Sequence, residues 1–216
     1  MSDERPLPIW QESILLVVSA VVLALIIKTF FIQAFYIPSE SMEPGLVPDD
    51  KLLVQKVSYW SGEPERGDIV VFEDPGNWLG GVPTGASNPL QKALEAVGLF
   101  PTGGHLIKRV VGVGGDDVAC CDSEGRTTVN GQPIDEPYLQ DAGVNAEQQY
   151  AQKVPEGYLW VLGDNRGNSQ DSRAHLGQAG GGFISVDAVV GKAWLRVWPF
   201  GRFGFLDGTD AFEAVE

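Results

Sequence analysis

The longest uninterrupted apolar stretch of the chain lies close to its N-terminus. Residues 13–32 read SILLVVSAVVLALIIKTFFI, and as a helix these roughly 20 residues would span about 30 Å, the thickness of a bilayer core. Apolar residues occupy every face of this helix, unlike the one-sided pattern of a helix packed on a soluble core. Its single charge, Lys28, lies toward the C-terminal end, where a long side chain reaches the headgroups. The pattern predicts a transmembrane anchor over residues 13–33, after a short tail of residues 1–12.

A cleaved secretory signal is the alternative interpretation of the same stretch. Basic residues are nearly absent before it and no A-x-A cleavage pattern follows it, which favours a permanent anchor. Charge does not fix the orientation, because Arg5 is outnumbered by Asp3 and Glu4 before the stretch. Lys51 and Lys56 lie beyond it. Large domains cross a membrane largely regardless of charge, so an extracytoplasmic position of the remaining chain stays open.

Beyond the apolar stretch, short runs rich in β-branched and apolar residues are separated by Gly, Pro, Asp and Asn. This pattern is typical of β-strands and turns. We expect strands at residues 51–57, 68–72, 106–113, 117–121, 157–162 and 189–197. Asn130-Gly131 predicts a tight hairpin turn after a further strand at residues 126–129. The predicted fold class is mainly β, with an N-terminal transmembrane helix followed by an antiparallel β-sheet domain over residues 34–206.

Two segments depart from the strand pattern. Residues 74–104 are rich in Gly, Pro and Asn and are expected to be an insertion. Within them, residues 89–100 carry apolar positions at helical spacing, which indicates a short amphipathic helix packed on the domain or touching the membrane. Aromatic residues within 193–205 are expected either in the membrane interface or in the core. Residues 207–216 form an acidic C-terminal tail.

Composition narrows the classes of partner and cofactor. The 29 acidic and 15 basic side chains give a formal net charge of -14, which excludes nucleic acid as a partner because nothing would neutralise its phosphates. Cys120 and Cys121 are adjacent, where a disulfide would need a strained ring, so we expect two small apolar side chains at the end of a strand. His105 and His175 lack the spacing of a zinc site. No metal is expected.

The first candidate for chemistry follows the apolar stretch directly. In FYIPSESMEPGL at residues 35–46, Pro38 and Pro44 restrict the backbone around two serines. Ser41 is thereby held near the predicted membrane surface. A serine hydroxyl is a weak nucleophile at neutral pH and needs a base within hydrogen-bond reach. The motif alone is compatible with an ordinary turn serine or with a nucleophile.

A lysine is the better candidate base than a histidine. His105 lies in the glycine-rich insertion and His175 beside a predicted loop, so neither has the setting that a Ser-His-Asp triad needs. In HLIKRVVGV, a strand places Leu106, Lys108 and Val110 on one face. Apolar neighbours would desolvate the Lys108 amine and lower its pKa. The competing interpretation is an exposed strand lysine paired with a carboxylate.

A polar segment, GDNRGNSQDSR at residues 163–173, is dense in turn-forming residues. Asp164, Asp171 and Arg173 are expected to form a structural ion-pair network near the site. Ser169 would then be left to donate or accept a hydrogen bond near a buried lysine.

These segments, in this order behind an N-terminal span, resemble the type I signal peptidase family. Its Ser-x-Ser-Met-x-Pro pattern is met by Ser39, Ser41, Met42 and Pro44. Three further blocks of the family are similar to RGDIVVF at residues 66–72, KRVVGVGGD at 108–116 and the polar segment at 163–173. The insertion is a departure from the pattern, as is Gly167, where some relatives carry an acidic residue.

The resemblance implies a role for each matching residue. Ser41 corresponds to the acylated nucleophile and Lys108 to the general base, with Ser169 orienting the lysine. The oxyanion hole would consist of the Ser41 backbone N–H and the Ser39 hydroxyl. No cofactor is implied.

The resemblance also implies the substrate and the location. The substrate would be a secretory preprotein whose apolar signal lies in the lipid bilayer, cleaved after small residues at -3 and -1. Shallow pockets for those residues would be lined by Phe35, Ile37, Pro38, Met42 and Ile107. Such an enzyme is expected in the plasma membrane as a single-pass protein, with a cytoplasmic N-terminus and an extracytoplasmic catalytic domain.

Two other functions compete with this interpretation. A self-cleaving repressor-type Ser/Lys peptidase shares the dyad, but it predicts a DNA-binding module, which the apolar N-terminus and the acidic charge disfavour. An anchored β-domain that binds signal peptides without cutting them would be favoured if Ser41 or Lys108 were missing. Both residues are present.

Overall fold

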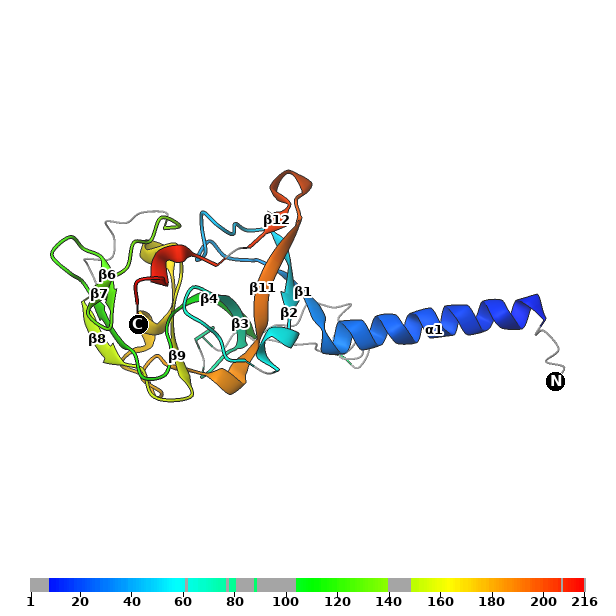
Figure 1. The fold of residues 1–216 in the computed structure, drawn as a ribbon, viewed down its shortest axis with the longest axis horizontal. Helices are drawn as coiled ribbons and strands as arrows, with labels where there is room; N and C mark the ends of the chain where they lie inside the picture. The colour runs from blue at the N-terminus through cyan, green and yellow to red at the C-terminus, as the bar shows by residue number, and fades with distance from the viewer. Residues whose placement is uncertain are drawn as a thin grey trace.

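The protein consists of one long N-terminal helix joined to a β-rich domain (Figure 1). The structure is a computed structural model that describes residues 8–60, 62–76, 78–80, 88, 104–139, 149–206 and 208–215. The predicted amphipathic helix at residues 89–100 therefore lies outside the described residues. The mainly β fold class with an N-terminal apolar helix is confirmed.

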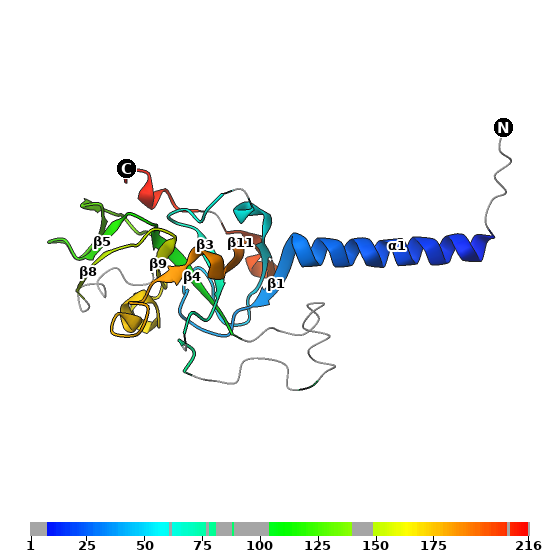
Figure 2. The ribbon, with the colours of Figure 1, turned by 90° about the horizontal axis from the view of Figure 1, so that it is seen from below.

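Helix α1 (Ile9–Phe30) extends away from the domain along the long axis of the molecule (Figures 1 and 2). Its segment Ile9–Lys28 has a mean hydropathy of 2.2 and is not buried anywhere, so by length and composition it can cross a membrane. The helix starts four residues before the expected start at residue 13. It also ends earlier than expected, because strand β1 (Ile32–Tyr36) begins almost at once and pairs with the domain.

The main sheet has eight strands in the order β1-β2-β11-β3-β4-β9-β10, and β12 pairs with β11. Every pairing in it is antiparallel. Besides β1, its strands are β2 (Lys51–Gln55), β3 (Ile69–Glu73), β4 (His105–Gly112), β9 (Tyr158–Leu162), β10 (Ile184–Ser185), β11 (Val189–Trp198) and β12 (Gly204–Phe205).

A second, four-stranded sheet has the order β7-β6-β5-β8. It comprises β5 (Asp117–Cys120), β6 (Thr127–Val129), β7 (Gln132–Pro133) and β8 (Tyr150–Lys153). Short 3₁₀ helices lie between strands of the main sheet or after the last strand: η1 (Val57–Tyr59), η3 (Arg166–Asn168), η4 (Ser172–His175), η5 (Val186–Ala188), η6 (Phe200–Arg202) and η7 (Asp210–Phe212).

The strands expected from the sequence are confirmed, each with its ends within two residues of the observed bounds. The hairpin turn is also confirmed, because Asn130 and Gly131 adopt positive φ of 53° and 77° between β6 and β7. Strand β1 was missed because its residues continue the apolar stretch of the helix. Strand β8 was missed because its sequence, YAQK, is too short and polar to show a strand pattern.

Strand β4 carries the residues that position the site, and it is buried on both faces. Ile107 packs in a cluster with Ile37 and Met42 of the turn after β1 and with residues of β2 and β3. Its neighbours Leu106 and Val110 pack in a different cluster, on the opposite face of the sheet. The alternation expected from the sequence therefore holds, and Lys108 shares the face of Leu106.

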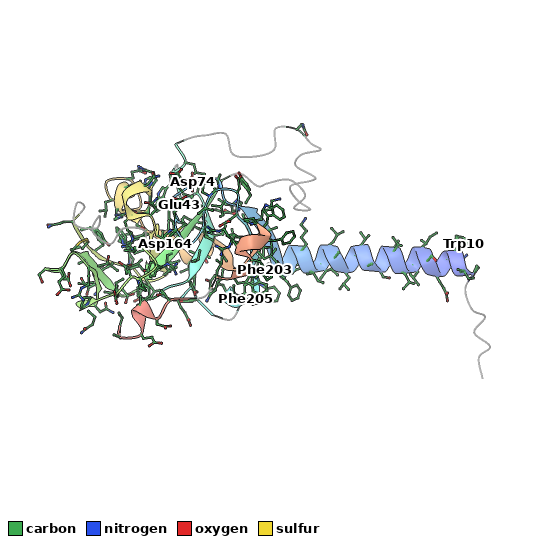
Figure 3. All side chains as sticks on the ribbon, turned by 90° about the horizontal axis from the view of Figure 1, so that it is seen from above. Trp10, Glu43, Asp74, Asp164, Phe203 and Phe205 are labelled. Carbon is green, nitrogen blue, oxygen red and sulfur yellow. A yellow bond between two sulfur atoms is a disulfide. The ribbon has the colours of Figure 1, made fainter. Side chains whose placement is uncertain are left out.

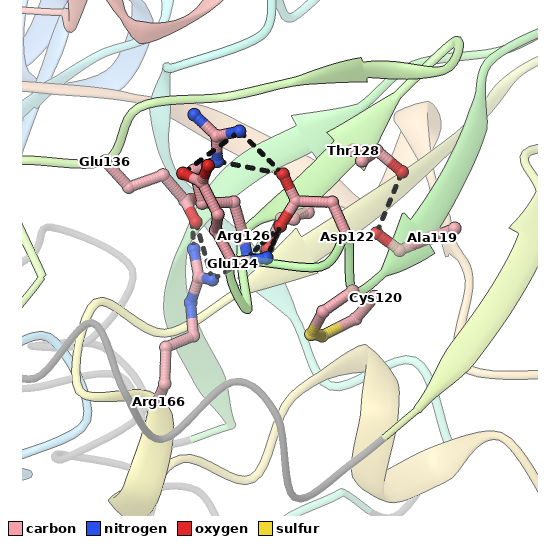
Figure 4. The surroundings of a disulfide bond; sticks show 10 residues. Ala119, Cys120, Asp122, Glu124, Arg126, Thr128, Glu136 and Arg166 are labelled. Carbon is pink, nitrogen blue, oxygen red and sulfur yellow. Dashed lines mark hydrogen bonds and ion pairs between the residues drawn. A yellow bond between two sulfur atoms is a disulfide. The ribbon is translucent and has the colours of Figure 1, made fainter.

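Cys120 and Cys121 differ from the expectation of two separate thiols. The structure joins them in a disulfide at the end of β5 (Figure 4). Cys120 is buried in an apolar cluster with Val118 and Trp160, so the expected apolar surroundings are present. The expectation assumed the usual disulfide geometry, in which the two cysteines lie on separate segments of the chain. This disulfide instead joins two residues that are adjacent in the sequence.

Candidate active site

Ser41 lies in the turn between β1 and β2. The base of this turn is closed by two backbone hydrogen bonds, from Ile37 N to Asp50 O at 3.0 Å and from Asp49 N to Ile37 O at 3.0 Å. Inside the turn, Leu46 N donates to Met42 O at 2.9 Å. Because β1 and β2 are paired, the chain that carries Ser41 is held at both ends by the sheet.

Lys108 reaches Ser41 from strand β4, which is separated from β2 in the sheet by β11 and β3. Its Nζ donates to Ser41 Oγ at 2.7 Å and to the carbonyl oxygen of Ile107 at 3.0 Å. Both residues are buried, with 4% of Lys108 and 7% of Ser41 exposed. Burial lowers the pKa of Lys108 to about 8, although the carboxylates of Asp171 and Asp164 oppose this shift. A substantial fraction of the amine is therefore neutral near pH 8.

Ser39 lies on the same turn as Ser41. The two hydroxyl oxygens are 3.3 Å apart. A developing negative charge beside Ser41 Oγ would therefore be within reach of the Ser39 hydroxyl.

The polar segment at residues 163–173 holds the Ser41 turn from one side. Asn165 N donates to Ser41 O at 3.1 Å, and its side-chain amide donates to Glu40 O at 3.1 Å. Asn168 Nδ2 donates to the Glu40 carboxylate at 3.0 Å. Gly163 permits this approach, because a Cβ there would collide with Ser41 O and Ser169 Oγ. These contacts fix the backbone of the serine against the segment.

Ser169 lies in the same cleft as Ser41 and Lys108. Its hydroxyl is buried and lies close enough to the Asp171 carboxylate to help lower the pKa of that group, whereas the described contacts include no hydrogen bond from Ser169 to Lys108. The structure thus brings Ser169 to the site without the expected hydrogen bond to Lys108.

Asp171 and Arg173 form a buried ion pair behind the site. Arg173 donates to both carboxylate oxygens of Asp171, at 2.9 and 2.8 Å, and Gly163 N donates to the same carboxylate at 3.0 Å. Burial alone would raise the pKa of Asp171, but the hydrogen bonds and charge of Arg173 hold this pKa below its usual range.

Asp164 is part of a second ion pair that the sequence did not reveal. Arg109 donates to both of its carboxylate oxygens, at 2.8 and 2.7 Å, and stacks over the ring of Tyr138 at 4.0 Å. A third pair joins Arg166 to Glu136 (Figure 4). The expected pairing of Asp171 with Arg173 is therefore present, whereas Asp164 pairs with Arg109, which no local pattern signalled.

A clamp of two arginines holds the Ser41 turn from the other side. Arg196 Nη1 donates to Gly45 O at 2.6 Å. Arg202 Nη2 donates to Gly45 O at 3.0 Å, to Pro44 O at 3.4 Å and to the Asp50 carboxylate at 3.3 Å. Asp50 is fully buried. The hairpin of β11 and β12 thereby fixes the part of the turn that follows Ser41.

The residues expected to form the substrate pockets lie in two different places, an apolar cluster and a cleft. Phe35, Ile37, Met42 and Ile107 pack together in the cluster beneath the Ser41 turn. Pro38 lines a cleft of about 820 Å³ that also contains Ser39, Ser41 and Lys108.

Comparison with known proteins identifies the family. The chain matches the family described as signal peptidase, peptidase S26, over residues 10–198. The probable signal peptidase I of Mycobacterium leprae is 37% identical, covering 91% of this chain and 78% of its own length. Signal peptidase I of Mycobacterium tuberculosis is 39% identical, covering 90% and 74%. The probable signal peptidase I-2 of Synechocystis is 39% identical, covering 99% and 85%.

Among solved structures, signal peptidase I from Enterococcus faecalis aligns with a TM-score of 0.40 at 27% identity, covering 61% of this chain and 97% of that chain. The family match and the relatives settle the class of enzyme. The chain belongs to the signal peptidase family, peptidase S26. It is a peptidase that removes signal peptides.

The clamp provides a testable prediction. Replacing Arg202 by methionine removes the hydrogen bonds to Pro44 O and Gly45 O, so the turn loses part of its support on that side. Because a displacement of about 1 Å in a reacting group costs about 100-fold, we expect kcat to fall about tenfold while KM changes little. Arg126→Met is the matched control, because that arginine pairs at the surface with Asp122 and Glu124. Equal kcat for both variants would contradict a role for the clamp.

Proposed function

We propose that Ser41 and Lys108 are the catalytic dyad with which this enzyme cleaves preproteins after small residues at -3 and -1. The observation that carries the proposal is the hydrogen bond of 2.7 Å between the two buried side chains. A buried lysine with a lowered pKa is the activated base that a serine nucleophile needs.

The neutral Lys108 amine accepts the proton of Ser41 as Ser41 Oγ attacks the carbonyl carbon of the -1 residue. The Ser41 N–H and the Ser39 hydroxyl stabilise the resulting oxyanion. Lys108 then donates the proton to the leaving amine, which departs with the mature chain, and an acyl-enzyme remains. Lys108 next deprotonates a water molecule that attacks the ester, and the proton returns to Ser41 as the signal peptide leaves.

The cluster beneath the turn accounts for the proposed specificity. Met42 is fully buried, and Ile37 and Ile107 are nearly so. Bulky, tightly packed walls leave little depth for a substrate side chain, so small residues fit and large ones collide. Phe35 packs on the same cluster and leaves still less space for a substrate side chain.

We also propose that α1 anchors the enzyme in the membrane, with the N-terminus cytoplasmic and the domain extracytoplasmic. Exposed aromatic side chains support this placement, because aromatic rings favour the interface between lipid and water. Phe203 and Phe205 are 59% and 64% exposed and lie on the side of the domain from which α1 extends (Figure 3). Trp198 and Phe200 are exposed on the same hairpin. Trp194 instead packs against Phe205, with the two rings tilted by 36°.

The proposed specificity is tested by incubating the detergent-solubilised full chain with a preprotein that has alanine at -3 and -1. We expect one cut, directly after the -1 alanine, identified by the mass and N-terminal sequence of the product. Leucine at -1 should reduce kcat/KM by about 100-fold, whereas leucine at -2 should have little effect. Equal cleavage of the two leucine substrates would contradict the proposal.

The oxyanion hole gives a second prediction. Ser39→Ala removes the side-chain donor beside Ser41 and should lower kcat by about 10²- to 10³-fold, the usual effect of removing one such donor. Ser39→Thr keeps a hydroxyl and should retain a larger share of the activity. If both variants lost activity equally while their thermal unfolding stayed unchanged, Ser39 would act through packing instead of through its hydroxyl.

A further inference from the structure

The cleft of about 820 Å³ lies on the face of β4 that carries Leu106 and Lys108, and among the predicted pocket residues Pro38 also lines it. Leu106 and Lys108 line the cleft, whereas Ile107, between them in sequence, packs with Ile37 and Met42 on the other face. The catalytic pair lines the cleft, at its junction with the cluster of Ile37, Met42 and Ile107. A polypeptide held over that cluster by its -3 and -1 residues has the cleft open to it beyond Ser41 and Lys108.

One wall of the cleft is apolar and firmly built. Trp78 is only 8% exposed and stacks on His175, with ring centroids 4.2 Å apart and planes 11° from parallel. Its edge packs against Phe72 at 6.0 Å. The Asp74 carboxylate accepts the backbone N–H groups of Trp78 and Leu79 at 2.8 and 3.2 Å, which fixes this turn. The wall is thus preformed.

The facing wall is polar and comes from the Ser41 turn and the segment at residues 163–173. Glu40, Asn168 and Gln170 line it. The buried Ser169 hydroxyl, which lies beside the Asp171 carboxylate, is on the same side. An extended polypeptide fits such a cleft, because its backbone groups need polar partners while its side chains favour an apolar surface.

We propose that this cleft binds the first residues of the mature chain, those that follow the scissile bond, and that Trp78 makes it select apolar side chains there. The inference rests on the proposed function of Ser41 and Lys108. The placement agrees with the chemistry, because the leaving amine must stay beside Lys108 Nζ to receive its proton. The backbone of the mature chain lies along the polar wall, and a side chain packs on Trp78, Leu79 and Leu106.

The experiment uses two peptides that are identical through -1 and carry leucine or serine at +1 and +2. The full chain in detergent should cleave the leucine peptide with a kcat/KM about tenfold higher. In Trp78→Ala the kcat/KM values for the leucine and serine peptides should be equal within about twofold, whereas Trp78→Phe should largely keep the wild-type preference for leucine. A second pair of peptides carries alanine or glycine at -1. The ratio of their kcat/KM values should be the same in both variants as in the wild type. Tyr158→Ala, which removes an exposed aromatic ring of β9, is the matched control and should change neither ratio.

A second variant tests the cleft without touching the tryptophan. Ala174 lines the cleft from η4, so Ala174→Leu should narrow it and reduce cleavage of the leucine peptide at least about fivefold more than that of the serine peptide. The inference is overturned if the wild type does not discriminate at +1 and +2, or if Trp78→Ala and Ala174→Leu both leave the ratio unchanged. Ser41→Ala tests the proposed function separately from the role of the cleft. Cleavage by Ser41→Ala at the wild-type rate would overturn the Ser41–Lys108 dyad, whatever the peptides with leucine and serine show.

Discussion

Replacing Ser41 by alanine is expected to abolish preprotein processing, with a rate at least about 10⁴-fold below that of the wild type. The change removes the only atom of the turn that lies within hydrogen-bond distance of Lys108 Nζ among the contacts of the described residues. Without Ser41 Oγ no acyl-enzyme forms, and Lys108 has no hydroxyl to activate. Binding of the preprotein should remain, because the pocket residues are untouched.

The measurement is the initial rate of product formation in detergent, followed by mass spectrometry. Ser58→Ala is the matched control, since Ser58 lies in η1, outside the Ser41 turn, and should process the preprotein at the wild-type rate. Thermal unfolding of both variants shows whether they are folded. Undiminished processing by Ser41→Ala would mean that another residue is the nucleophile.

Replacing Lys108 is expected to have an effect of similar size, and arginine is the most informative replacement. An arginine keeps the positive charge but stays protonated at every accessible pH, so it cannot accept the Ser41 proton. Lys108→Arg and Lys108→Met should both lower kcat by at least about 10³-fold. Substantial activity of Lys108→Arg would show that the site needs a cation there and not a base.

The lowered pKa of Lys108 also predicts how stability depends on pH. Its pKa is about 8 in the folded protein and about 10.4 in an unfolded chain. Between these values the unfolded chain binds more protons, so the stability contributed by this group increases as pH rises. Below about pH 8 the folded protein carries the full cost of the buried ammonium, about 3 kcal/mol.

Lys108→Met removes this cost. The variant should therefore unfold at a higher temperature than the wild type at pH 7, and the difference should shrink toward pH 10. The unfolding temperatures of the variant and the wild type are measured by circular dichroism in detergent at pH 7 and pH 10. A variant that melts below the wild type at pH 7 would contradict the cost assigned to the buried lysine.

Local sequence patterns predicted most of the fold because strands and turns have short-range signatures. The alternation in β4 correctly placed Leu106 and Lys108 on one face, and Asn130-Gly131 marked a turn with positive φ. Strand β1 escaped notice because an apolar strand that follows an apolar helix shows no change of composition. Its pairing with β2, on the far side of the Ser41 turn, is a tertiary contact.

The sequence predicted that Ser39, Ser41, Lys108 and Ser169 lie together, and they line one cleft, but it did not predict the contacts that support them. Ser41 and Lys108 are each ambiguous in their own segments, and only the order of the segments and their resemblance to a family pointed to a pair. Arg109 binds Asp164 from 55 residues away, and Arg202 reaches Gly45 from 157 residues away. Such contacts depend on the completed sheet, so no local pattern reveals them.

The proposed catalysis depends most directly on a neutral Lys108 that activates Ser41. The decisive measurement is the pre-steady-state rate of acylation, followed by release of the mature fragment, between about pH 6 and 10. In the wild type we expect a rate that rises with pH through an apparent pKa near 8, and in Lys108→Arg no such ionisation. A wild-type profile that is flat across this range, or an identical rise in Lys108→Arg, would contradict a role for Lys108 as the base.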